Sequence, residues 1–216
     1  MITKSFTAAI IGGGPAGCEC ALWLQMMGLH PIILERSDHL GGLQNLSPYQ
    51  NQWIVGVMNT SGRELAHNIQ KHMQQKEIPV IYDAIVAALK QSSDGFTLDV
   101  AGQYIHARFI VIAAGSVQHK DAVIAPDNQD AHDASFANQI VTANNGWQAN
   151  LPEAFLVLQE KLLNKDGFII TNSDCATPVA GIFAIGEAAN RMHPCVVTAM
   201  ADGVVAAKAI QAACGN

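Results

Sequence analysis

Three glycines near the N-terminus have the spacing Gly12-x-Gly14-x-x-Gly17 and follow a short apolar stretch. In this spacing the first glycine permits a tight turn, and the second lets the backbone approach a phosphate closely. The third lets a helix pack against a strand. A helix that starts in this turn, which also holds Pro15 and Ala16, presents free N–H groups and the positive end of its dipole. These residues therefore predict a site for the pyrophosphate of a dinucleotide.

The elements around this turn strengthen the prediction. Residues 6–11 indicate a buried strand, residues 16–28 a helix and residues 31–35 a second strand, which together form a βαβ unit of a parallel sheet. Glu35 ends the second strand, where its carboxylate can accept a hydrogen bond from a ribose hydroxyl. An ordinary turn between strand and helix is the plainer alternative, because glycine turns are common. The dinucleotide could be NAD(P) or FAD.

Hydrophobic spacing predicts the remaining elements of an α/β fold. A helix over 62–76 follows an N-cap at Thr60 or Ser61. We therefore predict a single Rossmann-like domain with a central parallel sheet and an antiparallel β-meander. The other expected elements are a strand at 78–82, the meander at 85–90, 96–100 and 104–106, a buried strand at 109–113, a helix at 152–163, short strands at 168–170 and 182–185, and a last helix at 195–213.

Residues 116–150 differ from the rest of the chain in being rich in Asn, Gln and Asp, with no helical or strand period. A polar connector of this length is uncommon inside a compact domain. We expect residues 1–216 to form one domain assembled from two stretches, 5–115 and 165–213, with the connector at 116–150 between them.

Composition and charge exclude several classes of protein. Of the 216 residues, 50% are hydrophobic and 14% are charged, which argues against a disordered chain. A formal net charge of −6 and the absence of any Lys/Arg cluster argue against a nucleic-acid partner. The sequence shows no uninterrupted apolar run of about 18 residues and no recognisable signal peptide, so we expect a cytoplasmic protein without a membrane partner.

The pattern as a whole resembles one family of flavoproteins. The first glycine turn, Glu35, a second glycine turn at 41–43, the strand end at 111–115 and the segment 177–187 are similar to the FAD domain of the thioredoxin reductase-like family, in the pyridine nucleotide-disulfide oxidoreductase superfamily. The resemblance implies FAD as cofactor and, by analogy, a homodimer. Beyond the first turn and Glu35, it implies contacts to FAD from Arg36, Gly42, Leu43, Ala84, Ile85, Ala114, Gly115, Gly186, Glu187, Cys195 and Val196.

Two parts of that family's pattern are missing here. The family inserts an NADPH domain between the two halves of its FAD domain, whereas only residues 116–167 lie there, without a second glycine fingerprint. The redox CxxC of that inserted domain is absent as well. The five cysteines fit no zinc-binding spacing, so we expect free thiols and no metal site. In addition, Ala114 replaces the family's Thr, and Glu187 replaces its Asp.

Cys195 and His193 are the candidates for a catalytic role. Cys195 is expected at the start of the last helix, where the family has Arg-Gln, and a helix N-terminus lowers the pKa of a thiol. His193 at the flavin edge would donate a proton or a hydrogen bond. The plainer interpretations are a packed thiol and a solvated loop histidine, and we favour both of them.

The sequence predicts an FAD-dependent oxidoreductase that receives electrons from its substrate or from a separate reductase or redox partner. One alternative is a non-catalytic flavoprotein: a redox sensor, an interaction module or the flavin subunit of a two-chain enzyme. A further alternative, an NAD-binding dehydrogenase domain, predicts a protein without the yellow colour of flavin.

Overall fold

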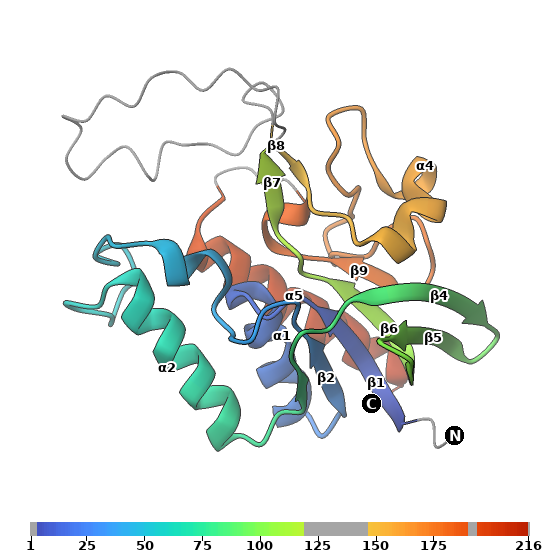
Figure 1. The fold of residues 1–216 in the computed structure, drawn as a ribbon, viewed down its shortest axis with the longest axis horizontal. Helices are drawn as coiled ribbons and strands as arrows, with labels where there is room; N and C mark the ends of the chain where they lie inside the picture. The colour runs from blue at the N-terminus through green and yellow to red at the C-terminus, as the bar shows by residue number, and fades with distance from the viewer. Residues whose placement is uncertain (1–3, 119–146, 190–193, 216) are drawn as a thin grey trace.

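The computed structural model describes residues 4–118, 147–189 and 194–215. A seven-stranded sheet forms the centre of this described part (Figure 1). Its strand order is β3-β2-β1-β6-β5-β4, with β9 beside β6. The strands are β1 (Lys4–Ile11), β2 (Pro31–Leu34), β3 (Val80–Ile81), β4 (Val86–Ser92), β5 (Gly95–Val100), β6 (Gln103–Ile112) and β9 (Ile182–Ala184).

Strand β6 joins the two kinds of pairing in this sheet. It runs parallel to β1 along its length, and its first half pairs antiparallel with β5. Its second half pairs parallel with β9. The predicted α/β fold with a parallel core and an antiparallel meander, β4-β5-β6, is therefore confirmed. The prediction of separate strands at 104–106 and 109–113 is wrong, because both belong to β6.

Three α-helices contribute to the core on one face of the sheet: α1 (Pro15–Met26), α2 (Gly62–Gln75) and α5 (Val196–Cys214). Helices α1 and α5 lie against each other (Figure 1). Gly203 makes this close approach possible, because a Cβ there would lie 2.5 Å from the Ala16 carbonyl oxygen. Helix α2 begins where predicted, since the Ser61 hydroxyl accepts from the Glu64 N–H and the Glu64 carboxylate accepts from the Ser61 N–H.

The opposite face of the sheet is covered by residues after the connector. The helix predicted at 152–163 is mostly a 3-10 helix, η3 (Glu153–Leu158), followed by one turn of α-helix, α4 (Gln159–Leu162). Phe155, Leu162 and Phe168 are buried there among the sheet residues. The strand predicted at 168–170 is reduced to a bridge between Ile169 and Leu163. Shorter 3-10 turns are η1 (Gly42–Leu46) and η4 (Gly186–Ala189).

The two ends of the polar connector pair with each other. β7 (Ser116–Gln118) and β8 (Trp147–Ala149) form a two-stranded antiparallel sheet, so the expectation of no strand in this segment is wrong at both ends. Residues 119–146 lie outside the described residues. The pairing brings residue 150 back to the end of β6, where the Asn150 N–H donates to the Gly115 carbonyl at 2.9 Å.

Helix α5 is, in the described part of the chain, a helix long and apolar enough to cross a membrane by length and composition. The face that carries Asp202, Gly203, Ala206, Ala207 and Ile210 is buried in the structure. This face packs against α1 and the sheet.

Candidate functional site

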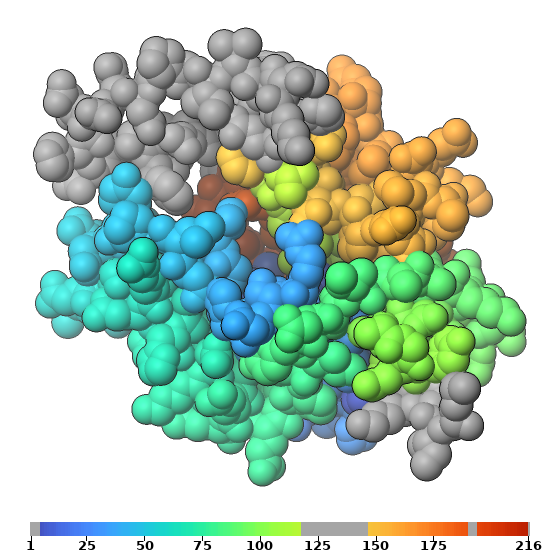
Figure 2. Space-filling view, in the orientation of Figure 1, coloured from blue at the N-terminus to red at the C-terminus, as the bar shows by residue number. Residues whose placement is uncertain are grey.

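Four parallel strands end at one edge of the sheet, and the predicted site residues follow them directly. Gly12 follows β1, Glu35 follows β2, residues 113–115 follow β6, and Gly186 lies just beyond β9. The carboxyl edge of a parallel sheet is where open α/β folds bind ligands. Figure 2 shows a hollow in this region, bordered by the blue segment that follows β2 and by the yellow-green β7.

Two of the three fingerprint glycines are required by the protein itself. Gly12 has φ +109°, and a Cβ there would lie 2.4 Å from the Ala113 carbonyl oxygen. A Cβ on Gly17 would lie 2.0 Å from the Gly12 carbonyl oxygen, because α1 packs directly on the turn. Real Cβ atoms essentially never come within 3.0 Å of such atoms. These two positions therefore need glycine with or without a ligand.

Gly14 is different, because nothing in the protein excludes a Cβ there. Its φ of −72° is ordinary, and a Cβ would come no closer than 3.9 Å to the Gly42 Cα. As N-cap of α1, Gly14 supplies no side-chain cap, and the first turn of the helix holds no acidic residue. The N–H groups at this helix end are thus free of side-chain acceptors from its cap, and a bound anion can accept from them.

Glu35 holds the glycine turn as well as facing the site. Its carboxylate accepts from the Gly13 N–H at 2.6 Å and from the Ser37 N–H at 2.8 Å, and the residue is 9% exposed. Its carbonyl accepts from the Ala84 N–H, which fixes the buried Ala84 beside it. A carboxylate has about four acceptor positions, so two remain for ribose hydroxyls.

The second glycine turn lies over the first. The Gly41 N–H donates to the Gly13 carbonyl at 2.8 Å, and a Cβ on Gly42 would lie 3.0 Å from the Gly14 Cα. In the segment that follows, Gln44 Oε1 and Asn51 Nδ2 are buried without a hydrogen-bond partner. Buried polar atoms are rarely unpaired in proteins.

Glu187 lies in η4, which follows β9 at the same edge of the sheet. Its carboxylate accepts from the Ser116 hydroxyl at 3.1 Å. The Asn150 side-chain amide donates to the Ala114 carbonyl and so fixes the turn that carries Ala114 and Gly115. Ala114 lacks the hydroxyl of the family's Thr, and Ser116 supplies one two residues later.

Burial raises the pKa of Glu187 above its usual value of 4.5, while the hydrogen bond from Ser116 acts in the opposite direction. Ionisation of Glu187 therefore reduces stability as the pH rises from about 4.5 through the raised pKa. We predict that Glu187→Gln makes the FAD-free protein more stable than the wild type at neutral pH. This advantage disappears as the pH falls toward 4.5.

Urea unfolding of both proteins across this pH range measures the effect. The exposed Glu160 offers a matched control, since Glu160→Gln removes a carboxylate that has lost little hydration. A stability difference at Glu187 that does not change with pH would contradict the prediction.

Several predicted site residues take no part in the hydrogen bonds and packing described above. Ile85 and Leu43 are 61% and 51% exposed, and Arg36 is exposed as well. The exposed Cys195 is the N-cap of α5, which begins at Val196. Its thiol accepts from the Thr198 N–H, so the structure gives it a capping role. His193 lies outside the described residues.

The sequence prediction did not include three residues that the structure places in this site. Ser116 and Asn150 come from the polar connector, whose composition gave no sign of them. Asp202 is a buried carboxylate on α5 that accepts from the Gly186 N–H at 3.1 Å. An acidic residue within an Ala- and Val-rich helix was a signal that could have identified it.

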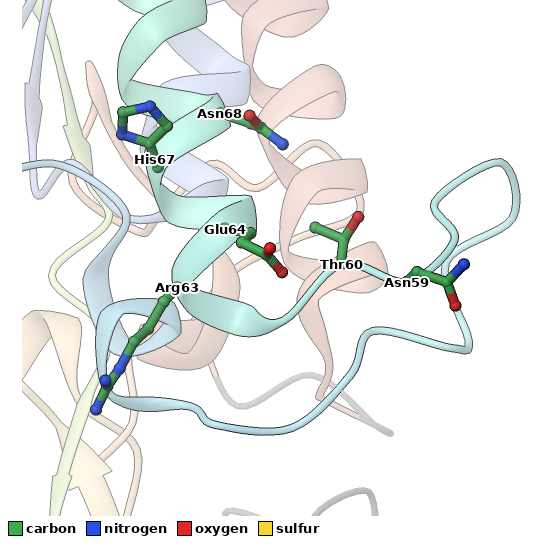
Figure 3. A pocket seen from close by; sticks show the side chains of 6 residues that line it. All are labelled: Asn59, Thr60, Arg63, Glu64, His67 and Asn68. Carbon is green, nitrogen blue, oxygen red and sulfur yellow. The ribbon is translucent and has the colours of Figure 1, made fainter.

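A shallow hollow of about 340 Å³ lies elsewhere, over the start of α2 (Figure 3). Its side chains diverge, with Arg63 and Asn59 pointing away from one another. Glu64 in this hollow is already engaged with Ser61. In the described residues, no group of three His, Cys, Asp or Glu side chains is arranged to hold a metal ion.

Known proteins resemble the chain in both sequence and fold. The profile of the family described as pyridine nucleotide-disulphide oxidoreductase matches residues 9–145. A ferredoxin–NADP reductase of Lactiplantibacillus plantarum is 30% identical over 141 residues, which are 64% of this chain and 41% of that protein. The chain thus spans less than half the length of this curated relative.

Solved structures show the same fold at low sequence identity. The thioredoxin reductase of T. acidophilum superimposes with a TM-score of 0.79 and 16% identity, covering 99% of this chain and 100% of that chain. That of Lactococcus lactis gives a TM-score of 0.77 with 16% identity, covering 96% and 98%. The chain therefore belongs to the pyridine nucleotide-disulphide oxidoreductase family, whose members typically bind FAD, and has a thioredoxin reductase-like fold.

Proposed function

We propose that the chain binds FAD at the carboxyl edge of its sheet and acts as a flavin-dependent oxidoreductase. Electrons reach this flavin from a substrate or from a separate partner protein. In the family to which the sequence is similar, an NADPH domain stands where this chain has residues 116–167.

The observation that carries this proposal is Gly14. The contacts of the protein explain why Gly12 and Gly17 are glycines, but a Cβ on Gly14 would make only an ordinary contact, 3.9 Å from the Gly42 Cα. Close approach of a pyrophosphate to the N-terminus of α1 supplies the missing reason. Together with Glu35, which can accept from ribose hydroxyls, this arrangement favours a dinucleotide.

FAD, when bound, supplies the electron or hydride transfer. The N–H groups at the start of α1 would hold its pyrophosphate, and the Glu35 carboxylate would accept from the ribose of its AMP half. By resemblance to the family's second FAD motif, Glu187 would contact the ribityl and pyrophosphate region. The first turn of α5 contains no acidic residue, so its positive dipole end can stabilise negative charge on a reduced flavin.

Anaerobic reductive titration of the purified protein tests whether this flavin is used in catalysis. NADH, NADPH, dithiols and reduced ferredoxin are added in turn, and loss of the visible flavin band is recorded. We expect at least one of these donors to bleach the flavin within seconds to minutes, with recovery when oxygen or a redox partner is added. A protein that binds FAD but is bleached by none of them is not an oxidoreductase for these donors, and the non-catalytic alternative then gains support.

A further inference from the structure

Glu35 and Asp202 are the most deeply buried carboxylates in the described part of the chain, each 9% exposed. Each accepts a hydrogen bond from the N–H of a glycine in a turn at the same edge of the sheet. Glu35 accepts from Gly13 at 2.6 Å, and Asp202 accepts from Gly186 at 3.1 Å. Burial of a carboxylate is costly unless it is hydrogen-bonded, so both carboxylates must hold defined partners.

The Gly186 turn packs against helices α1 and α5, which contact each other. Gly186 has φ +65°, and a Cβ there would lie 3.1 Å from the Ala16 Cβ and 3.6 Å from the Ala199 Cβ. Next to Asp202, a Cβ on Gly203 would lie 2.5 Å from the Ala16 carbonyl oxygen. The start of α1, the Gly186 turn and α5 therefore meet at Ala16, and Asp202 connects two of these three parts.

We propose that Asp202 is a positioning residue for the flavin half of the site, as Glu35 is for the glycine turn of the AMP half. Asp202 acts through the Gly186 N–H and does not itself touch the cofactor. Through this bond it holds Gly186 and therefore the carboxylate of Glu187, one residue later, in place. The inference rests on the proposed function, because the ligand concerned is FAD.

Titration with FAD and with ADP separates this role from a general loss of structure. ADP carries only the adenosine and pyrophosphate part of FAD. We expect Asp202→Ala to weaken FAD binding about 10- to 100-fold while ADP binding changes much less. Asp202→Asn keeps a side-chain oxygen that can accept from the Gly186 N–H, and it is expected to recover most of the lost FAD affinity.

Asp99 is the matched control. Its carboxylate also accepts from a glycine N–H, that of Gly102 at 2.9 Å, but in an exposed turn between β5 and β6. Asp99→Ala is expected to leave the ratio of FAD to ADP affinity unchanged. An equal loss of FAD and ADP binding in Asp202→Ala, or no loss of either, would overturn the proposal.

Amide hydrogen exchange in the wild type keeps the test decisive if Asp202→Ala does not fold. We expect the Gly186 N–H to be protected already in the FAD-free protein, because its acceptor is part of the chain. Exchange at the rate of an open loop would refute the Asp202 contact. A wild type that binds no FAD would instead contradict the proposed function, and the two failures are thereby distinguished.

Discussion

Gly14→Val is expected to give a folded protein without FAD. Valine can adopt the extended backbone of Gly14, with φ −72° and ψ −179°, and its Cβ meets no protein atom within 3.5 Å. As an N-cap, valine is poorer than glycine, so a stability loss of about 1 kcal/mol is expected. The side chain occupies the space in front of the N-terminus of α1, where the pyrophosphate must approach.

The expected increase in the dissociation constant for FAD is at least about 100-fold, or roughly 2.7 kcal/mol. Fluorescence titration with FAD measures this change, and circular dichroism with urea unfolding shows that the fold is retained. Gly14→Ala is the graded control, since one methyl group fills less of the same space and a smaller loss of affinity is expected. FAD retained at full stoichiometry in Gly14→Val would show that the pyrophosphate does not lie there.

Gly17→Ala is expected to destabilise the fold itself. The new Cβ would lie 2.0 Å from the Gly12 carbonyl oxygen and 3.2 Å from the Ala113 Cβ. Alanine gains about 1 kcal/mol in helix propensity over glycine. The clash is with backbone, which cannot move without shifting α1 from the sheet. Overpacking therefore outweighs the gain in helix propensity. The free energy of unfolding is expected to fall by about 3 kcal/mol or more.

Urea unfolding of the FAD-free protein measures this loss without involving the ligand. Gly14→Ala again provides the comparison, because the same substitution three residues earlier meets no clash and is expected to cost only about 1 kcal/mol, the loss of glycine as N-cap. If both variants are equally stable, the packing of α1 on the glycine turn differs from that described here.

The sequence signals for the first half of the candidate site are local. Strand, glycine turn, helix and Glu35 follow one another within a short stretch, and each has its own sequence rule. The structure places Gly12, Glu35 and Gly186 at one edge of the sheet, as a set of parallel strands requires, and packs Gly42 on Gly14. The capped start of α2 was predictable for the same reason, since Ser61 and Glu64 lie three residues apart.

The errors arise where a local pattern changes along one element. In β6 buried and exposed positions alternate in the first half, whereas the last four residues are all buried. The pattern changes because the second half of β6 is covered on both faces of the sheet. This change led to the prediction of two strands where there is one. The contacts of Asp202 and Ser116 were not predictable, because their partners lie 16 and 71 residues away in the sequence.

The most direct test is a titration of the purified, cofactor-free wild-type protein with FAD and, separately, with NAD. We predict saturation at one FAD per chain, with the visible absorption of a protein-bound flavin, and much weaker binding of NAD. Binding of NAD but not FAD, or of neither dinucleotide, would contradict assignment of the carboxyl edge of the sheet as a flavin site.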